Sequence, residues 1–341
     1  MKKPVCGSLA RIADFDERPY DVETVDQSEW ETGDYVVGEV NGVPTELYRV
    51  EDCDGEMLAS LPGDRVIGAL GVRAATLEGV GSWMDVVQGK MHALTSAGLF
   101  GAFTSMSRFL PDPMSLNYVG HIRRDGVSVR MKDFALTSSS TGYDMPTLLL
   151  VGTSMNAGKS MTGKLVCQVL SAAGLNVIGT KLTGAGRYKD IMSFSHAGAN
   201  EVYDFVDVGL PSTVVPEDEF RAAIRPLLAH INSRKPDIVV AEAGASPLEP
   251  YNGAAAIDEL GDTICCTILC ASDPYAVVGV QQAFNLTPDL VTGPATNTSA
   301  AIDLVKKLAG VPAMNILDPG AVHALRDFLA EKLGRSMDPP D

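Results

Sequence analysis

A glycine, a lysine and a serine lie between an apolar run and a helical pattern near the middle of the chain. Gly158, Lys159 and Ser160 follow the apolar residues 147–151, and a helix is expected over 159–173. Successive backbone N–H groups of such a loop form a concave anion site, to which the helix N-terminus adds the positive end of its dipole. Lys159 would reach the β- and γ-phosphates of a nucleotide, and the Ser160 hydroxyl would bind Mg²⁺. The predicted nucleotide contacts are Gly152, Thr153, Ser154, Met155, Asn156, Ala157, Gly158, Lys159, Ser160 and Met161.

The spacing of this loop departs from the usual phosphate-binding motif. Five residues separate Gly152 from Gly158, one more than in the pattern G-x-x-x-x-G-K-[ST], and Thr153 stands at the usual first-glycine position. An ordinary glycine-containing turn between a strand and a helix is the alternative interpretation. The order of strand, loop, Gly-Lys-Ser and helix favours the phosphate-binding loop.

Charged residues follow two further apolar runs that are expected to be strands. Lys181 comes directly after residues 176–180, and Glu242 comes directly after residues 237–241. In open α/β sheets, ligands bind outside the carboxyl ends of the strands, so these side chains are expected beside the loop. The predicted catalytic residues are Lys159 and Lys181, and the predicted Mg²⁺ ligands are Ser160, Asp190 and Glu242.

Other residues near these strand ends are candidates for contacts with a substrate. The alternative interpretations are a solvated, glycine-rich loop after Lys181 and a helix or turn cap at Glu242. Asp204 and Asp207 remain open between a site contact and exposed structural acids. The predicted substrate contacts are Thr183, Gly184, Arg187, Gly244, Ala245 and Tyr251.

Strand-like and helix-like segments alternate from residue 147 onwards. Continuous apolar strands between helices indicate an α/β domain whose mostly parallel sheet is covered by helices on both faces. The preceding part shows short strand-like runs with Asn-Gly and Asp-Gly turns, which favour a smaller β-rich domain of the barrel or sandwich type. The predicted organisation is an N-terminal arm or edge segment over 1–32, the β-rich domain over 33–136, a polar linker over 137–146, the nucleotide-binding domain over 147–334 and a frayed tail over 335–341.

The composition is that of a globular protein with an acidic surface. The chain has 341 residues, 45% of them hydrophobic, and a formal net charge of −16. This charge argues against broad binding to nucleic acids or anionic membranes. The first residues show no apolar run of a signal peptide, and the six cysteines form no CxxC motif or Cys/His cluster. We therefore expect a cytoplasmic protein without nucleic-acid or membrane partners.

The loop resembles that of one branch of P-loop proteins. Gly152-Thr153, with its five-residue spacing to Gly158-Lys159-Ser160, is similar to the loop G-T-D-T-x-V-G-K-T of dethiobiotin synthetase. The resemblance covers roughly residues 147–316 and implies the dethiobiotin-synthetase-like, MinD-related class of P-loop NTPases, with ATP and Mg²⁺ as cofactors. In dethiobiotin synthetase, ATP phosphorylates a carbamate and an amine closes on the mixed anhydride.

Two strand ends extend this resemblance, and other positions depart from it. Lys181 followed by Gly184 is similar to the family's second-strand lysine and glycine, and Glu242-Ala243-Gly244 resembles its E-G-A-G-G. In contrast, Ser154 stands where the family has Asp, and the β-rich domain has no counterpart there. Nucleotide binding therefore carries over better than the substrate does.

Two functional hypotheses follow from these motifs. The first is an enzyme that uses Mg·ATP to activate a small carboxylate-type metabolite by phosphoryl transfer for amide or related bond formation, with a small-molecule kinase as the near variant. The second is a nucleotide-driven switch or delivery protein of the MinD type, with the β-rich domain as partner surface. A homodimer is expected. ATP rather than GTP is expected because no N-K-x-D guanine motif follows the strands.

Overall fold

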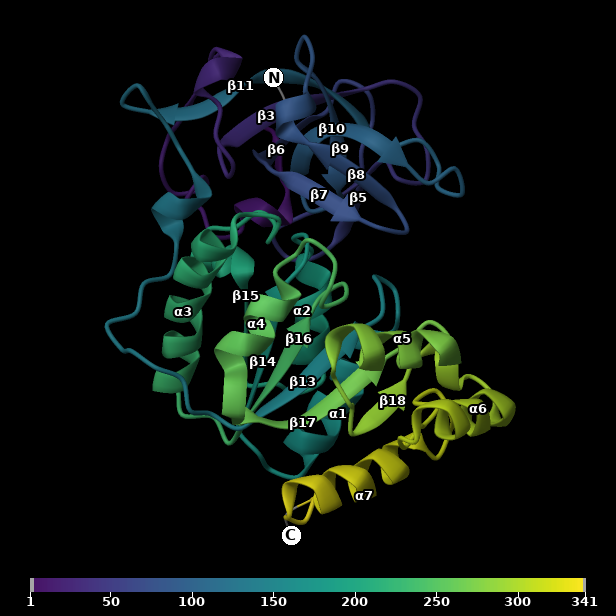
Figure 1. Ribbon diagram of the computed structural model, residues 1–341. Coiled ribbons are helices and arrows are strands. Elements are labelled where there is room, and N and C mark those ends of the chain that lie inside the picture. The colour runs from purple at the N-terminus through teal and green to yellow at the C-terminus, as the bar shows by residue number, and fades with distance from the viewer. Residues whose placement is uncertain (1–2, 340–341) are drawn as a thin grey trace. The chain divides into compact units, whose positions relative to one another are not determined.

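The structure, a computed structural model, describes residues 3–339, and the chain forms two compact units (Figure 1). The β-rich unit contains the chain up to Thr137 together with two later segments, Ala185–Lys189 and Phe205–Pro216. The α/β unit contains the remaining segments, Ser138–Gly184, Asp190–Asp204 and the chain from Glu217 onwards. The nucleotide-binding domain that the sequence predicts as continuous over 147–334 is therefore interrupted twice by segments of the β-rich unit.

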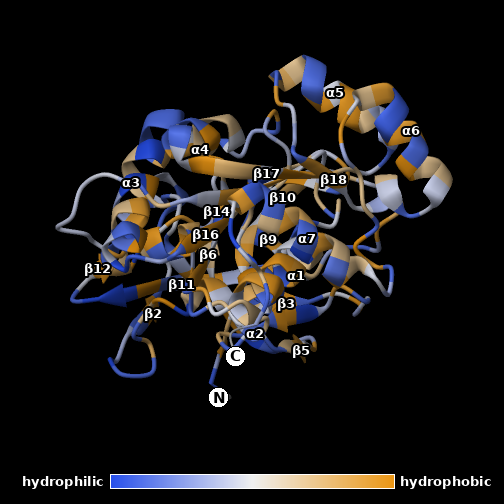
Figure 2. Ribbon diagram, turned by 90° about the horizontal axis from the view of Figure 1, so that it is seen from below, coloured by the Kyte–Doolittle hydropathy of each residue, from blue (hydrophilic) through white to orange (hydrophobic). Residues whose placement is uncertain are grey.

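The α/β unit is built on a sheet of six parallel strands in the order β15-β14-β16-β13-β17-β18. The central strand β13 is buried along its whole length, which explains its continuous apolar sequence. Figure 2 shows β17 and β18 mainly in the colours of hydrophobic residues. The strands are β13 (Thr147–Gly152), β14 (Val177–Thr183), β15 (Glu201–Asp204), β16 (Ile238–Ala243), β17 (Ile264–Cys270) and β18 (Leu290–Thr292).

Helices cover both faces of this sheet, as the sequence predicts (Figure 1). Residues of α1, α2 and α7 share one apolar cluster with Leu150 of β13, Val240 of β16 and Ile268 of β17. The helices α3 and α4 pack against each other, and α5 packs against α6. The helices are α1 (Lys159–Ala172), α2 (Tyr188–His196), α3 (Glu217–Ser233), α4 (Gly253–Leu260), α5 (Pro274–Phe284), α6 (Ser299–Ala309) and α7 (Ala321–Leu333).

The β-rich unit contains a closed ring of strands, which confirms the barrel alternative. Neighbouring strands pair in the order β6-β3-β11-β9-β10, and a parallel pairing of β10 with β6 closes the ring. Val36, Leu70, Phe100 and Leu116 belong to its apolar cluster. The ring strands are β3 (Tyr35–Asn41), β6 (Arg65–Leu70), β9 (Lys90–Thr95), β10 (Leu99–Met106) and β11 (Ser115–Arg124), and the others are β1 (Val5–Cys6), β2 (Asp21–Glu23), β4 (Arg49–Glu51), β5 (Met57–Ala59), β7 (Val72–Ala75), β8 (Gly79–Ser82) and β12 (Val127–Ser128).

Both chain ends pack more extensively than the sequence predicts. Within residues 3–32, β1 pairs with β6 at the edge of the sheet and β2 pairs with β11, which fits the edge-segment alternative better than a separate arm. Phe15 and Trp30 are buried there, so the aromatic residues among the acidic ones decide the packing. Within the predicted frayed tail, Met337 is buried in the core of the α/β unit, whereas Arg335, Ser336 and Asp338 are exposed. The last two residues of that predicted tail lie outside the described residues.

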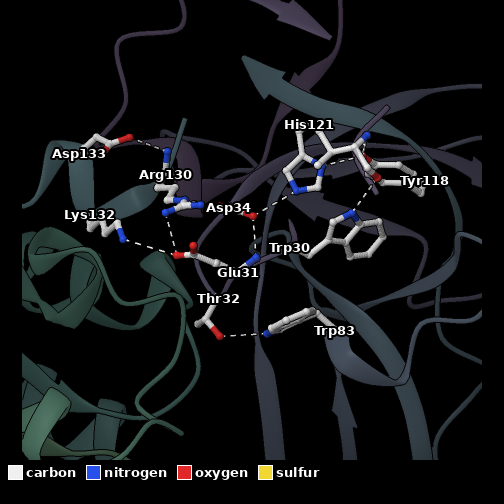
Figure 3. Close-up of polar contacts among 11 residues, drawn as sticks. Trp30, Glu31, Thr32, Asp34, Trp83, Tyr118, His121, Arg130, Lys132 and Asp133 are labelled. Atoms are coloured by element: carbon white, nitrogen blue, oxygen red, sulfur yellow. Dashed lines mark hydrogen bonds and ion pairs between the residues drawn. The ribbon is translucent and has the colours of Figure 1, made fainter. Parts of the chain in front are cut away.

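A buried polar network ties the N-terminal segment to β11 (Figure 3). Asp34 is completely buried and accepts hydrogen bonds from Arg130 Nε (2.8 Å), from the Glu31 N–H (2.7 Å) and from His121 Nε2 (3.2 Å). This tautomer leaves His121 Nδ1 to accept a hydrogen bond from the Tyr118 hydroxyl at 2.6 Å. Since each of these polar groups has a hydrogen-bond partner, we interpret the network as structural.

Among residues 3–339, no helix has the length and apolar character needed to cross a membrane.

Candidate nucleotide-binding site

The predicted phosphate-binding loop joins the end of β13 to the start of α1. The Thr153 N–H donates to the Cys270 carbonyl at 3.0 Å, and the Thr153 hydroxyl accepts from the Ser272 N–H at 3.0 Å. These bonds fasten the first loop residue to the end of β17. Thr153, at the usual first-glycine position, therefore has a structural role, because it connects the loop to the end of β17.

Lys159 reaches back across the loop from the first position of α1. Its side chain is 5% exposed, and Nζ donates to the Ser154 carbonyl at 2.8 Å. A Cβ atom on Gly152 would lie 2.6 Å from this Nζ, so the loop is closed around the ammonium group. Gly158 precedes the helix with a φ of 99°, and no side chain caps the helix there. The positive helix end and the lysine together form a cradle suited to an anion.

The loop after β18 packs against the phosphate-binding loop. A Cβ atom on Gly293 would lie 2.3 Å from the Ala157 carbonyl oxygen, so only a glycine fits at this approach. Asn156 adopts a positive φ of 61°, which gives the loop a second left-handed residue besides Gly158. The side chain of Met161 is 52% exposed, so any contribution of this predicted contact to phosphate binding would come from its backbone.

Charged residues of three adjacent strands lie at the same level of the sheet. Lys181 of β14 is in register with Asp204 of β15 and with Glu242 of β16. Lys181 Nζ donates to Asp190 Oδ2 at 2.6 Å, and Ser160 Oγ donates to Glu242 Oε2 at 3.2 Å. The structure thus brings together the predicted catalytic lysine of the second strand and all three predicted Mg²⁺ ligands.

Burial and neighbouring charges shift the pKa values in this cluster. Burial lowers the pKa of Lys181, but the charges of Asp190 and Glu242 raise it by more, so it lies above its ordinary value. Burial raises the pKa of Glu242 against the opposing charges of Lys181 and Lys159. Lys181 therefore keeps its positive charge at neutral pH and balances the carboxylates around it.

The donor set fits a Mg²⁺ ion that arrives with phosphate groups. Among residues 3–339, no group of three or more His, Cys, Asp or Glu side chains could hold a metal ion by itself. Mg²⁺ is usually held by one or two carboxylates together with substrate phosphates and water. The hydroxyl of Ser160 beside the carboxylate of Glu242 matches this requirement, and Asp190 is the second carboxylate of the cluster.

The predicted substrate contacts lie in different surroundings. Thr183 is completely buried and donates to the Gly244 carbonyl at 3.2 Å, which ties the ends of β14 and β16 together. Tyr251 is also completely buried. Arg187 is exposed and belongs to the β-rich unit, whereas the clustered residues belong to the α/β unit. Gly184 lies beside Lys181, where an added Cβ would meet Lys181 Cε at 3.2 Å. Ala245 is buried, with a positive φ of 57°.

Asp204 is the residue whose role the sequence left open. It is 1% exposed, and its charge acts on Lys181. The sequence signal for a role in the site was its position at the end of a segment that in the structure forms β15, the strand next to β14. The parallel register, which the sequence does not show, places it level with the lysine.

No protein-family model and no curated protein matches the chain. Among solved structures, chloroplast FtsY from Physcomitrella patens aligns at 13% identity over 57% of this chain and 66% of its own, with a TM-score of 0.35. FtsY from Thermotoga maritima aligns at 14% identity over 52% of this chain and 62% of its own, with a TM-score of 0.35. HypB from Helicobacter pylori, solved in complex with nickel, aligns at 15% identity over 55% of this chain and 87% of its own, with a TM-score of 0.36.

These likenesses are distant, and the alignments span less than two thirds of the two FtsY chains. At TM-scores of 0.35 and 0.36 they carry no argument about the finer class that the loop resembles. The assignment of the fold rests on this chain's own parallel sheet and on the loop between β13 and α1. The α/β unit is a parallel sheet covered by helices on both faces, with the candidate phosphate-binding loop between its central strand β13 and α1.

Proposed function

We propose that the α/β unit binds a Mg²⁺–nucleoside triphosphate on the loop from Gly152 to Met161 and cleaves its terminal phosphoanhydride bond. The observation that carries this proposal is the cluster of Lys159, Ser160 and Glu242 with the Lys181–Asp190 ion pair beside it. Two lysines and two carboxylates around one helix N-terminus suit phosphoryl transfer, where catalysis is mostly positioning and charge neutralisation.

Each side chain has a distinct task in this reading. Lys159 leaves the Ser154 carbonyl and binds the β- and γ-phosphate oxygens. Lys181 shares its charge between Asp190 and the terminal phosphate. Ser160 and Glu242 orient the phosphate end of the nucleotide, and Asp190 supports the same edge. Mg²⁺, when bound there, supplies charge neutralisation at the phosphate oxygens.

Use of the nucleotide as a switch is favoured by the path of the chain. Directly after Gly184 and directly after Asp204, the chain enters the β-rich unit. Such connections let a change at the phosphate site reach another part of the molecule, which a switch requires. FtsY from Elizabethkingia anophelis, another of the distant structural likenesses, was solved in complex with GDP, so GTP is tested beside ATP.

A phosphoryl-activating ligase or a small-molecule kinase is the second candidate. The observation in its favour is Lys181, a second buried lysine next to the predicted metal ligands. A second cation stabilises the charge that develops when the phosphoryl group moves to an acceptor. The two candidates differ in turnover, because only the second requires a small acid for rapid phosphate release.

The replacement Lys159→Ala tests the proposed function. We expect turnover of ATP or GTP, measured by phosphate release, to fall by at least about 100-fold, since charge stabilisation at the transferred group is lost. Lys164→Ala is the matched control, because Lys164 is an exposed lysine of the same helix. Full turnover in Lys159→Ala, or no nucleotide binding by the unmodified chain, would overturn the proposal.

A companion experiment separates the two candidate uses. Sizing with and without nucleotide and Mg²⁺ reports assembly, and phosphate release with and without added carboxylic acids reports an acceptor. Nucleotide-dependent dimers with slow, acid-independent hydrolysis support the switch. Acid-stimulated turnover in an unchanged oligomeric state supports the ligase or kinase.

A further inference from the structure

We propose that Arg11 and Glu51 of the β-rich unit are positioning residues for the phosphate site. They hold the two segments that continue from the strands carrying Lys181 and Asp204. This inference rests on the proposed function, because it gives the β-rich unit a task in that same site. It goes further, because it states that residues outside the α/β unit orient Asp190, a predicted Mg²⁺ ligand.

The chain passes from the site into the β-rich unit and back within a few residues. Gly184 is the last residue of the α/β unit after β14, and Asp190 is the first after the return. The five intervening residues, Ala185–Lys189, therefore set where α2 starts and where Asp190 lies in its first turn. The second excursion, Phe205–Pro216, begins directly after Asp204.

Glu51 fastens the first excursion at the start of α2. Its side chain is completely buried, and Oε1 accepts a hydrogen bond from the Lys189 N–H at 2.8 Å. A carboxylate at this position accepts a hydrogen bond from an N–H group of the first helical turn that has no partner within the helix. Its negative charge also interacts favourably with the positive end of the helix dipole. The Glu51 N–H donates to the Ser96 carbonyl at 2.8 Å, so this acceptor is itself anchored beside the barrel strands. The bonded Lys189 directly precedes Asp190.

Arg11 connects the two excursions with one side chain. Its guanidinium lies 4.5 Å from the ring centroid of Tyr188 in the first excursion, and NH2 lies 2.8 Å from Asp207 Oδ1 in the second. The Arg11 side chain is 9% exposed, so this pair is shielded from solvent more than a surface ion pair is. Arg11 thus connects Tyr188, two residues before Asp190, with Asp207, three residues after Asp204.

Further hydrogen bonds and one close approach fix both excursions to other residues of the β-rich unit. The Leu136 N–H donates to the Asp207 carbonyl at 2.7 Å, and the Ser212 hydroxyl donates to the Val72 carbonyl at 2.6 Å. A Cβ atom on Gly186 would lie 2.3 Å from Leu9 Cδ2, so this glycine allows a close approach. The excursions are built into the unit, and a change of their anchors is expected to move the residues that follow them.

The expected consequence concerns Mg²⁺ more than the nucleotide. Asp190 holds Lys181 at 2.6 Å and is a predicted metal ligand, whereas Lys159 and the loop bind phosphate from another element. Residues that orient a metal ligand typically change metal affinity or activity by about 10- to 100-fold when they are removed. Loss of Glu51 or Arg11 should therefore weaken the binding of Mg²⁺ that supports turnover and leave the affinity for nucleotide alone nearly unchanged.

The test uses the full chain with Glu51→Ala, Glu51→Gln, Arg11→Gln and Arg11→Lys. For Glu51→Ala and Arg11→Gln, we expect the Mg²⁺ concentration for half-maximal turnover to rise about 10-fold, and the dissociation constant for nucleotide without Mg²⁺ to change little. Glu51→Gln keeps an acceptor oxygen and Arg11→Lys keeps the charge, so both should recover part of the loss. Arg123→Gln is the matched control, since Arg123 pairs with Glu23 within the same unit.

Hydrogen exchange provides a readout that does not need nucleotide. We expect the amides of residues 190–196 to exchange several-fold faster in Glu51→Ala and Arg11→Gln than in the control, because the start of α2 loses its anchor. Folded variants with unchanged exchange and unchanged Mg²⁺ dependence would overturn the inference. If Glu51→Ala does not fold, Arg11→Gln decides. If the unmodified chain binds no nucleotide, the proposed function fails and hydrogen exchange alone decides the positioning role.

Discussion

At the scale of single residues, the site depends on close approaches that leave no room for a side chain. Gly152 lies against the ammonium and the Cδ of Lys159, and Gly244 lies against the Thr183 carbonyl, where a Cβ atom would come within 2.2 Å. A glycine at such a point lets two chain segments meet without a gap. The resulting loop holds Lys159 inside the cradle, next to the helix N-terminus.

Gly152→Ala tests this close approach. The added methyl group would lie 2.6 Å from Lys159 Nζ and 3.0 Å from the Ala245 carbonyl oxygen, so the ammonium must move. We expect nucleotide affinity, measured by titration with a fluorescent analogue, to fall about 10-fold, which corresponds to the usual cost of overpacking. Gly279→Ala in α5 is the control, because a Cβ there meets nothing within 4 Å. Equal affinities of the two variants would contradict the prediction.

Two cysteines of the β-rich unit give a pH-dependent prediction. The neighbouring Cys53 thiol lowers the pKa of the Cys6 thiol below its ordinary value, against the opposing effect of burial. Because the thiolate is the reacting form, Cys6 should be alkylated by iodoacetamide at a lower pH than an ordinary thiol. The pH profile of alkylation at Cys6, followed by mass spectrometry, checks this. Cys53→Ala removes the neighbouring thiol and should shift the profile to higher pH; an unchanged profile would refute the prediction.

At the scale of elements, one aromatic side chain packs between a helix and a strand of the α/β unit. Phe194 of α2 lies against Gly163 of α1, where a Cβ atom would come within 2.3 Å of the ring. It also lies against Gly179 of β14, with a corresponding distance of 2.8 Å. The ring therefore occupies a slot between two glycines, and this slot sets how closely α1 approaches the strands that carry the site.

Gly163→Ala should disturb this slot. The methyl group would overlap the Phe194 ring and approach Leu150 Cδ1 at 2.8 Å, so we expect the free energy of unfolding in urea to fall by about 1–3 kcal/mol. Phe194→Leu removes the overlapping ring atoms and should recover part of this loss in the double variant, although it destabilises the unmodified chain. Strictly additive effects of the two substitutions would speak against the slot.

At the scale of the whole molecule, charge and chain path matter most. The net charge of −16 comes from 43 acidic and 27 basic residues. A folded chain with such an excess repels itself more than an unfolded one. In the described part of the chain, local ion pairs offset some of this repulsion, for example Arg221 with Glu259 and Arg130 with Asp34.

The excess negative charge predicts a salt effect on stability. Raising the ionic strength to about 0.15 M shortens the screening length to about 8 Å and weakens the repulsion, so the melting temperature should rise. A non-ionic solute at equal osmolality serves as control. A melting temperature that falls on adding salt would mean that favourable ion pairs outweigh the net repulsion.

The sequence by itself determined the strand, loop and helix of the candidate phosphate-binding site, the parallel sheet with helices on both faces, and a β-rich unit of the barrel or sandwich type. These depend on local patterns: apolar runs of strand length, Gly-Lys-Ser at a helix start, and Gly-containing turns. It also found Lys181, Asp190 and Glu242, because parallel strands bring their carboxyl ends to one edge.

Only the tertiary structure decided the rest, since it depends on contacts between residues distant in sequence. The register of β15 with β14 buries Asp204 level with Lys181, and no local pattern encodes that register. The segments Ala185–Lys189 and Phe205–Pro216 read as ordinary loops of the α/β domain, yet they pack in the β-rich unit. Their anchors, Arg11 and Glu51, lie more than 130 residues earlier in the chain, where sequence spacing gives no sign of the pairing.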